Sequence, residues 1–296
     1  MVSSRSLLER FSQFIDPEVE EIARIATYLI QSGGKALRPT LLLMTCEGFG
    51  YDPSLAIELA AGIEFIHVAS LLHDDVVDGA SLRRGKKSAN LVFGNQSCVL
   101  AGDYLYAKAL ELYANFGNIK AIEILSKAVM KMSQGQLLEL RSIGKILTKD
   151  EYFRIIDLKT GALIASSLQI GALIANQEKH ELIYKAGIHV GRAFQIVDDV
   201  LDYEGSESKF GKKVGSDIKE GKCTLPLICA EGALEDFSFP VKDPESLRLK
   251  VIELGGTKLA RSIAREELLK ALDLLSEFKE LENLIRFLEG IVEREN

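Results

Sequence analysis

The 296-residue sequence has few of the residues that cross-link or segment a protein. It contains only four cysteines, none in a CxxC pair, and only six prolines. Scattered cysteines of this kind fit neither a disulfide framework nor a paired-thiol metal site, so we expect buried thiols in a reducing compartment. No long glycine and serine tract marks a linker, and 47% of the residues are hydrophobic. Residues 1–296 are therefore predicted to form a single domain.

Signals for export, membrane insertion and nucleic-acid binding are also missing. Residues 1–14 are polar and mixed and lack the apolar centre of a signal peptide. No uninterrupted run of about 18 apolar residues predicts a membrane span. The formal net charge of −7 argues against a nucleic-acid surface. These absences predict a cytoplasmic protein with no nucleic-acid partner.

Strand patterns are absent as well. Apolar residues recur with a helical period along nearly the whole chain, and no segment alternates convincingly as a half-buried strand does. Asp16 and Pro17 are expected to begin the first clear helix, as N-cap and first helical residue. Asp52 and Pro53 are expected to begin another helix in the same way. The sequence therefore predicts an all-α fold.

What is present in two copies is an acidic motif. Each copy places three aspartates at i, i+1 and i+4 inside an apolar helical stretch. The six residues are Asp74, Asp75, Asp78, Asp198, Asp199 and Asp202. Residues three or four apart share a helix face, so each trio is expected to form one carboxylate cluster.

Clustered carboxylates in an apolar helix need a partner. Like charges repel, and an unpaired buried carboxylate is costly. A hard cation such as Mg²⁺ binds carboxylate oxygens and completes its shell with water and phosphate oxygens. The alternative, two solvated helix faces, is disfavoured by the apolar neighbours of both copies. The motifs therefore predict a diphosphate held by metal ions between two helices.

Basic residues gather in two places, each with two interpretations. Gly33–Pro39 contains Lys35 and Arg38 after two glycines. This stretch fits a helix carboxyl terminus with cations near its dipole, or an anion cradle. Arg83 and Arg84 follow the first aspartate motif. They fit a solvated loop, or a grip on a diphosphate, because guanidinium binds phosphate through two hydrogen bonds.

Two polar residues stand alone in apolar helices. His67 lies two turns before Asp74 on the same helix face. It fits a satisfied core histidine as well as a ligand. Lys159 lies in an apolar-rich helix and therefore needs an anionic partner or a route to water.

In this order, the motifs resemble those of the trans-polyprenyl diphosphate synthases, over roughly residues 30–290. Further matching positions are Lys159, Thr160, Phe194, Gln195, Gly211, Lys212 and Lys222. Class I terpene cyclases share one such aspartate motif but have a different second metal motif. The resemblance implies an isoprenoid synthase type I fold, a single large bundle of about ten or more helices around a central cavity. It also implies a homodimer that adds isopentenyl diphosphate head to tail to an allylic diphosphate such as farnesyl diphosphate.

The resemblance implies a role for each matching position. The six aspartates would bind several Mg²⁺ ions, with Asp74 and Asp198 also counted as catalytic. The allylic diphosphate would be held by Arg83, Lys159, Lys222 and either Lys212 or Lys213. Isopentenyl diphosphate would be held by Lys35, Arg38, His67 and Arg84. Lys159, Thr160 and Gln195 are the other catalytic candidates, and the last two would lie along the carbocation.

Product length is expected to depend on Ala69 and Ser70, five and four residues before Asp74. In short-chain members of the family a bulky aromatic residue here closes the cavity. The small residues predict an open apolar tunnel and a long product of about C30–C50, octaprenyl favoured, for quinone side chains. Farnesyl or geranylgeranyl diphosphate is the shorter alternative. Release of a long product would involve transient membrane contact.

Two other functions compete with this one. An HD-type phosphohydrolase would use His67, His73 and Asp74 with a distant aspartate, but it leaves the second motif unexplained. A non-catalytic partner subunit of a heterodimeric synthase would be expected to lack intact aspartate motifs.

Overall fold

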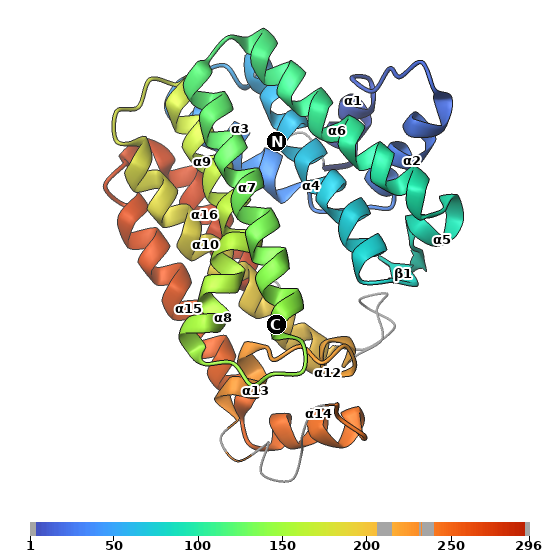
Figure 1. The fold of residues 1–296 in the computed structure, drawn as a ribbon. Helices are drawn as coiled ribbons and strands as arrows, with labels where there is room; N and C mark the ends of the chain where they lie inside the picture. The colour runs from blue at the N-terminus through green and yellow to red at the C-terminus, as the bar shows by residue number, and fades with distance from the viewer. Residues whose placement is uncertain (1–3, 206–214, 231, 233–239, 294–296) are drawn as a thin grey trace. The chain divides into compact units, whose positions relative to one another are not determined.

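The computed structural model describes residues 4–205, 215–230, 232 and 240–293, and helices cover most of them (Figure 1). This confirms the predicted all-α fold. Within the described residues, the strands are a two-residue antiparallel pair, β1 (Leu82–Arg83) and β2 (Lys86–Lys87). The pair lies in a stretch that the sequence indicated only as a loop.

Contacts along the chain divide it into two compact units. The first comprises Met1–Ser126 and Ser167–Glu178, and the second Lys127–Ser166 and Lys179–Asn296. The boundaries fall inside α7 (Ile119–Ser142) and α9 (Ala162–Ile174), so both helices contribute residues to both units. A single domain and a central cavity stay predictions.

The first unit is built from helices of very different length. They are α1 (Ser4–Ser12), α2 (Glu20–Gln31), α3 (Leu37–Gly48), the 3-10 helix η1 (Pro53–Ala56), α4 (Ile57–Val77), α5 (Ala89–Phe93) and α6 (Asn95–Phe116), with parts of α7 and α9. The expected helix start at Asp16 is wrong, because its carboxylate accepts a hydrogen bond from Lys108 at 3.0 Å and α2 begins at Glu20. Asp52 does cap η1, accepting from the Ser54 amide at 2.8 Å.

Helices α4 and α6 lie side by side and approach closely at two glycines (Figure 1). The fully buried Tyr113 ring fills the space over Gly62, where an added Cβ would lie 2.7 Å from a ring carbon. The Tyr113 hydroxyl donates to the Leu59 carbonyl at 3.2 Å. The His73 imidazole lies against Gly102 in the same way. Each of these large side chains thus packs against a glycine, which has no side chain, on the facing helix.

One stretch, Pro53–Val77, is long and apolar enough to cross a membrane by length and composition, and an 18-residue window within it has a mean hydropathy of 1.8. Counting uninterrupted apolar residues missed it, because Glu58 and Glu64 break the run. Buried core helices have the same composition, and 72% of this window is buried inside the protein. Its hydropathy therefore fits a core helix.

The second unit contains the remaining elements. They are α8 (Lys149–Ile156), the π-helix η2 (Asp157–Gly161), α10 (His180–Glu204), α12 (Ser216–Lys219), α13 (Leu225–Cys229), α14 (Pro244–Glu253), α15 (Gly256–Leu275), η3 (Lys279–Leu281) and α16 (Glu282–Glu293), with parts of α7 and α9. α8 begins with a capping box in which Thr148 and Glu151 satisfy each other's amides.

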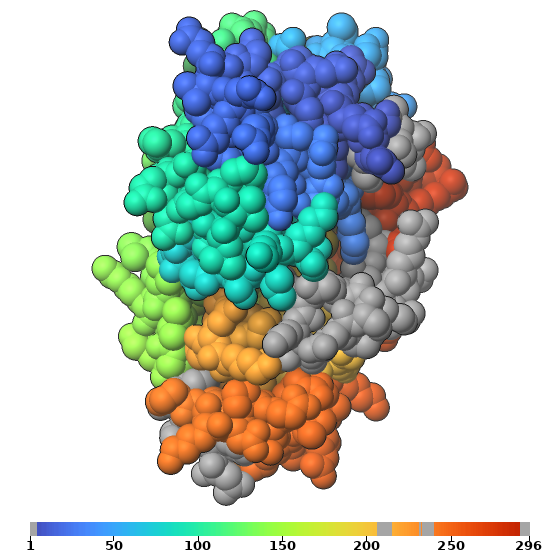
Figure 2. All heavy atoms as spheres, turned by 90° about the vertical axis from the view of Figure 1, so that its right-hand side faces the viewer, coloured from blue at the N-terminus to red at the C-terminus, as the bar shows by residue number. Residues whose placement is uncertain are grey.

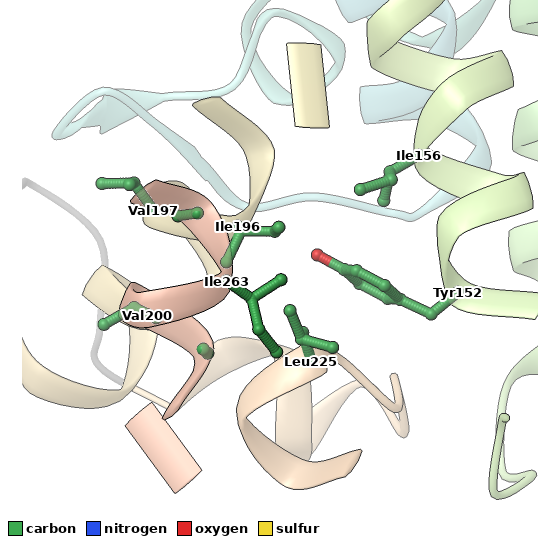
Figure 3. Close-up of a cluster of buried hydrophobic side chains, with 9 residues drawn as sticks. Tyr152, Ile156, Ile196, Val197, Val200, Leu225 and Ile263 are labelled. Carbon is green, nitrogen blue, oxygen red and sulfur yellow. The ribbon is translucent and has the colours of Figure 1, made fainter. Parts of the chain in front are cut away.

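Apolar side chains from four helices meet in the core of the second unit. Tyr152 points from α8 into a cluster with Ile196 of α10, Leu225 of α13 and Ile263 of α15 (Figure 3). Burying such side chains stabilises the unit by about 25 cal/mol for each Å² removed from water. The cluster fixes α8 against α10, and these two helices carry polar residues discussed below.

The α4–α6 contact predicts that Gly62→Ala destabilises the protein by about 1–3 kcal/mol, because the new methyl group would overlap the fully buried Tyr113 ring. The free energy of unfolding in urea measures this. Gly290→Ala in α16 is the matched control, since nothing lies within 4 Å of a Cβ added there. That control should be neutral or stabilising by up to about 1 kcal/mol. An unchanged free energy of unfolding in Gly62→Ala would contradict the packing described.

Candidate active site

The first aspartate motif ends α4, and its middle member is buried. Asp75 is fully buried, whereas Asp74 is half-buried and Asp78 is exposed. Arg83 of β1 donates from Nε to Asp75 Oδ1 at 2.9 Å and also ion-pairs with this carboxylate through Nη2. Consecutive residues on a helix point about 100° apart, so Asp75 can be buried while Asp74 beside it is only half-buried.

This arrangement corrects the expectation of one carboxylate cluster per motif. Within the part of the chain that the structure describes, no group of three or more His, Cys, Asp or Glu side chains is placed to hold a metal ion by itself. The spacing i, i+1, i+4 keeps the three side chains on one side of the helix, but Asp75 is buried there and Asp78 is exposed. A metal role for the six aspartates stays a prediction.

The hairpin that follows the motif places Arg84 in an unusual conformation. Arg84 has φ +51° and Gly85 has φ +76°, as in the two-residue turns that join antiparallel strands. The Arg84 guanidinium lies against Gly34, where an added Cβ would be 3.0 Å from Nη1. Lys86 and Lys87 are exposed, and this teal part of the chain reaches the surface in Figure 2. The turn thus brings Arg84 back to the glycine pair before α3.

Arg38 lies in the first turn of α3, just after Ala36, whose φ is +44°. A cation there faces the positive end of the helix dipole, so the helix-capping interpretation is wrong for Arg38. Its Nε is buried and, among the described residues, has no hydrogen-bond partner. The pKa of Arg38 is lowered to about 10, because burial and Arg84 lower it and Glu64 only partly opposes them. A buried cation with an unsatisfied donor is typical of a binding site.

Glu64 is the counter-charge that sequence analysis missed. It is only 5% exposed on α4. Burial raises the pKa of Glu64, while Arg38 and Arg84 lower it. Its position three residues before His67 on an apolar helix was the available signal. A buried acid among cations keeps them from repelling one another before an anion binds.

His67 lies half-buried among these cations. Burial, and then Arg38, Arg84 and Arg83, lower the pKa of His67 well below its ordinary value. The imidazole is therefore neutral at pH 7 and keeps one donor and one acceptor nitrogen. Its surroundings favour the ligand interpretation over that of a core residue.

The remaining predicted residues of the first unit are spread over two elements. Lys35 is exposed between α2 and α3. On α4, Ala69 is fully buried, and the half-buried Ser70 donates to the His67 carbonyl at 2.8 Å. A role of Ala69 and Ser70 in product length stays a prediction.

The second aspartate motif repeats the pattern of the first. Asp199 is 4% exposed and Asp198 is exposed. Tyr152 of α8 donates to Asp199 Oδ2 at 2.6 Å, and Gln195 Nε2 donates to Oδ1 at 2.8 Å. Thr160 in turn donates to Gln195 Oε1 at 2.7 Å. Sequence analysis predicted Thr160 and Gln195 but missed Tyr152, which is distant in sequence and supplies a donor from the apolar core.

Asp199 has a strongly shifted pKa. The net pKa is about 7, because burial raises it, hydrogen bonds from Tyr152 and Gln195 lower it, and Asp198 and Glu139 raise it. The pKa of Tyr152 is also raised by burial, and then by Asp199, so its hydroxyl keeps its proton. A carboxylate poised near neutrality is typical of active sites.

The third member of the second motif caps a helix. Asp202 Oδ1 accepts from the Ser216 hydroxyl at 2.6 Å, and Oδ2 accepts from the Asp217 amide at 3.0 Å. Asp202 therefore fixes the start of α12, a role that its position in the motif did not indicate.

Two predicted lysines meet one carboxylate that sequence analysis did not single out. Lys159 Nζ ion-pairs with Glu139 of α7, and Lys222 Nζ lies 3.9 Å from the same side chain and 2.8 Å from Glu220. Burial alone would lower the pKa of Lys222, but Glu139, Asp217 and Glu220 raise it overall. Lys159 thus has the anionic partner that its position required. Lys212 and Lys213 lie outside the described residues.

The carboxylate oxygens of the two motifs are the type of ligand that a hard divalent cation prefers. Asp74, Asp78 and Asp198 offer carboxylate oxygens that water reaches. Asp75 Oδ2 is buried and, among the described residues, has no hydrogen-bond partner, as expected of an oxygen that a cation would satisfy.

The chain matches the family model "Polyprenyl synthetase" over residues 19–236. The chain belongs to the polyprenyl synthetase family. It is 38% identical over 219 residues to octaprenyl diphosphate synthase of Escherichia coli, covering 73% of this chain and 68% of that one. It is 33% identical to a short chain isoprenyl diphosphate synthase of Methanothermobacter thermautotrophicus over the full length of both.

A solved structure supports the same assignment. A polyprenyl synthase from Caulobacter crescentus complexed with calcium and isoprenyl diphosphate superimposes with a TM-score of 0.92 at 34% identity, covering 99% of this chain and 95% of that one. The fold is thus that of the isoprenoid synthases, and the protein is a prenyltransferase that acts on isoprenoid diphosphates. The phosphohydrolase interpretation is excluded by this membership.

The pKa of Asp199 predicts how stability depends on pH in metal-free protein. Its folded value of about 7 exceeds the ordinary 3.8. Between these values the folded state holds a proton that the unfolded state has lost, so unfolding free energy falls as pH rises, and levels off above pH 7. Denaturant unfolding in EDTA from pH 4 to 8 should show this slope relative to Asp199→Asn, which cannot titrate. Parallel curves for the two proteins would contradict the shifted pKa.

Proposed function

We propose that the protein is a Mg²⁺-dependent trans-prenyltransferase that adds isopentenyl diphosphate units to an allylic diphosphate such as farnesyl diphosphate. The product is an all-trans chain of about C30–C50, with an octaprenyl chain favoured, suited to a quinone side chain. The observation that supports this best is the repeated aspartate motif in a polyprenyl synthetase. In each copy one carboxylate is buried and bonded by protein donors, and another is left accessible.

Metal ions would be held by Asp74, Asp75, Asp78, Asp198, Asp199 and Asp202. When bound, they supply positive charge that stabilises the diphosphate as the allylic C–O bond breaks. Arg83 keeps Asp75 oriented, and Tyr152 with Gln195 keeps Asp199 oriented. Such support holds the ligand oxygens in place before the ions arrive.

The cations divide into two groups with different tasks. Lys159 and Lys222, which share Glu139, would bind the allylic diphosphate together with Arg83. Lys35, Arg38, His67 and Arg84 would bind isopentenyl diphosphate. In this second group, the negative charge of Glu64 offsets part of the positive charge of the arginines. One diphosphate then loses its bond to carbon beside metal ions, while the other is held by side chains alone.

Thr160 and Gln195 are proposed to face the developing carbocation. Their hydrogen bond to each other places the Gln195 side chain with its oxygen toward Thr160 and its nitrogen toward Asp199. Both oxygens are electron-rich, which favours a neighbouring positive charge.

Two product lengths have support. The fully buried Ala69 and its neighbour Ser70 favour an open tunnel and a long chain. The full-length match to a short chain isoprenyl diphosphate synthase favours a product of about C15–C20 instead.

A product assay tests the function and separates these lengths. Purified protein, Mg²⁺, labelled isopentenyl diphosphate and farnesyl diphosphate are incubated, and the products are sized by chromatography. A ladder ending above about C25 supports the long-chain synthase, and termination at about C20 supports the shorter one. Folded protein that incorporates no label would contradict prenyl transfer. Omission of Mg²⁺ should abolish incorporation.

Asp74→Ala and Asp198→Ala should each lower kcat by several orders of magnitude without unfolding the protein, because a metal ligand is lost at an accessible site. Steady-state kinetics with circular dichroism as the folding check measures this. Asp273→Ala in α15, an exposed aspartate in neither motif, is the control. Near wild-type turnover in either motif variant would refute the metal role.

Ala69→Tyr should shorten the product to about C15–C20, because a phenol ring would block the tunnel below the diphosphate. A series from Ala69→Val through Ala69→Leu to Ala69→Tyr should shorten it step by step. Chromatographic sizing of the prenyl products is the measurement. An unchanged distribution across the series would show that the chain grows elsewhere.

The assembly and location are part of the proposal. We propose a homodimer in the cytoplasm that contacts the membrane transiently to release its apolar product. Light scattering after gel filtration gives the mass in solution, and flotation with vesicles tests the membrane contact.

A further inference from the structure

The segment that presents Lys159 and Thr160 has a rare backbone conformation. Asp157–Gly161 forms the π-helical turn η2 between α8 and α9. Within it, Lys159 reaches Glu139 and Thr160 reaches Gln195. π-Turns are uncommon and often occur at functional sites. Return to the α-helical register would rotate the following side chains by about 100°, so contacts must hold the turn.

Close backbone packing limits where the turn can lie. A Cβ added to Gly135 of α7 would be 2.5 Å from the Lys159 amide nitrogen. A Cβ added to Gly191 of α10 would be 2.5 Å from the Gly161 Cα atom. These contacts position the turn between two helices. Because van der Waals contact has no direction, it does not by itself select the π register.

A bidentate ion pair provides the directional contact that can select the π register. Arg192 of α10 donates from Nε and Nη2 to the two carboxylate oxygens of Asp157 at 2.6 and 2.7 Å. Asp157 is the first residue of the turn. The guanidinium also lies over the Phe153 ring, 4.7 Å from its centroid. A planar fork bound to both oxygens fixes the orientation of the carboxylate as well as its distance.

Arg192 is itself held by a second carboxylate. Its Nη1 donates to Glu267 of α15 at 3.2 Å. Glu267 is 3% exposed, pairs with His189 Nδ1 at 2.6 Å, and accepts from Lys270 Nζ at 2.6 Å. Although burial alone would raise it, these partners lower the pKa of Glu267 to about 2. The guanidinium is therefore held by two carboxylates, those of Asp157 and Glu267.

We propose that Arg192 is a positioning residue that holds η2, through Asp157, in the register that directs Lys159 and Thr160 to their partners. Its effect on catalysis rests on the proposed function, because Lys159 and Thr160 are expected to act on the allylic substrate. The positioning effect on the backbone does not depend on that function.

Hydrogen exchange tests the backbone effect without substrate. In Arg192→Gln, the amides of residues 157–164 should exchange about tenfold faster than in the wild type. Arg261→Gln is the matched control. Arg261 of α15 pairs with Glu204 of α10 at 2.6 and 3.1 Å, so it links α10 and α15 as the Arg192–Glu267 pair does, but it does not contact η2 through that pair. The control should leave this segment unchanged. Unchanged exchange in Arg192→Gln, or an equal rise in the control, would overturn the proposal.

Kinetics tests the consequence for catalysis. Arg192→Gln should lower kcat by about 10- to 100-fold and leave KM for isopentenyl diphosphate within about twofold. Arg192→Lys should recover thermal stability but not kcat, because an ammonium group cannot form the fork. Asp157→Asn combined with Arg192→Gln should be no worse than either alone.

The kinetic outcomes are separable from the proposed function. Full recovery of kcat in Arg192→Lys, or unchanged kcat in Arg192→Gln, would overturn the effect of this positioning on catalysis. A folded but inactive wild-type protein would contradict prenyl transfer, and hydrogen exchange would then decide the positioning role by itself.

Discussion

Both aspartate motifs depend on one constraint: a carboxylate buried in an apolar helix must receive hydrogen bonds. Asp75 receives them from Arg83, and Asp199 from Tyr152 and Gln195. An ionised carboxylate without such donors would cost several kcal/mol. The structures around the motifs follow from this need, since the β1–β2 hairpin supplies one donor and α8 supplies another. In each motif the buried member is held by these donors, whereas Asp78 and Asp198 are exposed.

The predicted substrate-binding cations likewise need partners of opposite charge. Glu64 accompanies Arg38 and Arg84, and Glu139 accompanies two lysines. Cations brought together out of water repel strongly, and one shared carboxylate removes most of that repulsion. Around Glu64 the arginines outnumber the carboxylate, whereas Lys159 and Lys222 are balanced by Glu139 and Glu220. In both groups the carboxylates limit the repulsion among the clustered cations.

Irregular backbone recurs where these groups are placed. Arg84 and Ala36 have positive φ, and Asp157–Gly161 is a π-turn. Regular helices alone would direct the side chains elsewhere. Such conformations are maintained only when their surroundings hold them. Gly34 makes room for one of them and Gly191 for another, so the glycines belong to the site as much as the charged residues do.

The sequence by itself determined the helical fold and the two motifs, because periodicity and spacing act between neighbours in the chain. It also singled out Thr160 and Gln195, through resemblance to a family, but their hydrogen bond to each other came only from the structure. Only the tertiary structure decided that Asp75 and Asp199, rather than their neighbours, are buried. It alone revealed the partners Tyr152 and Glu139. The physical reason is that spacing sets the face of a helix on which a residue lies, whereas burial and pairing depend on what packs against that face.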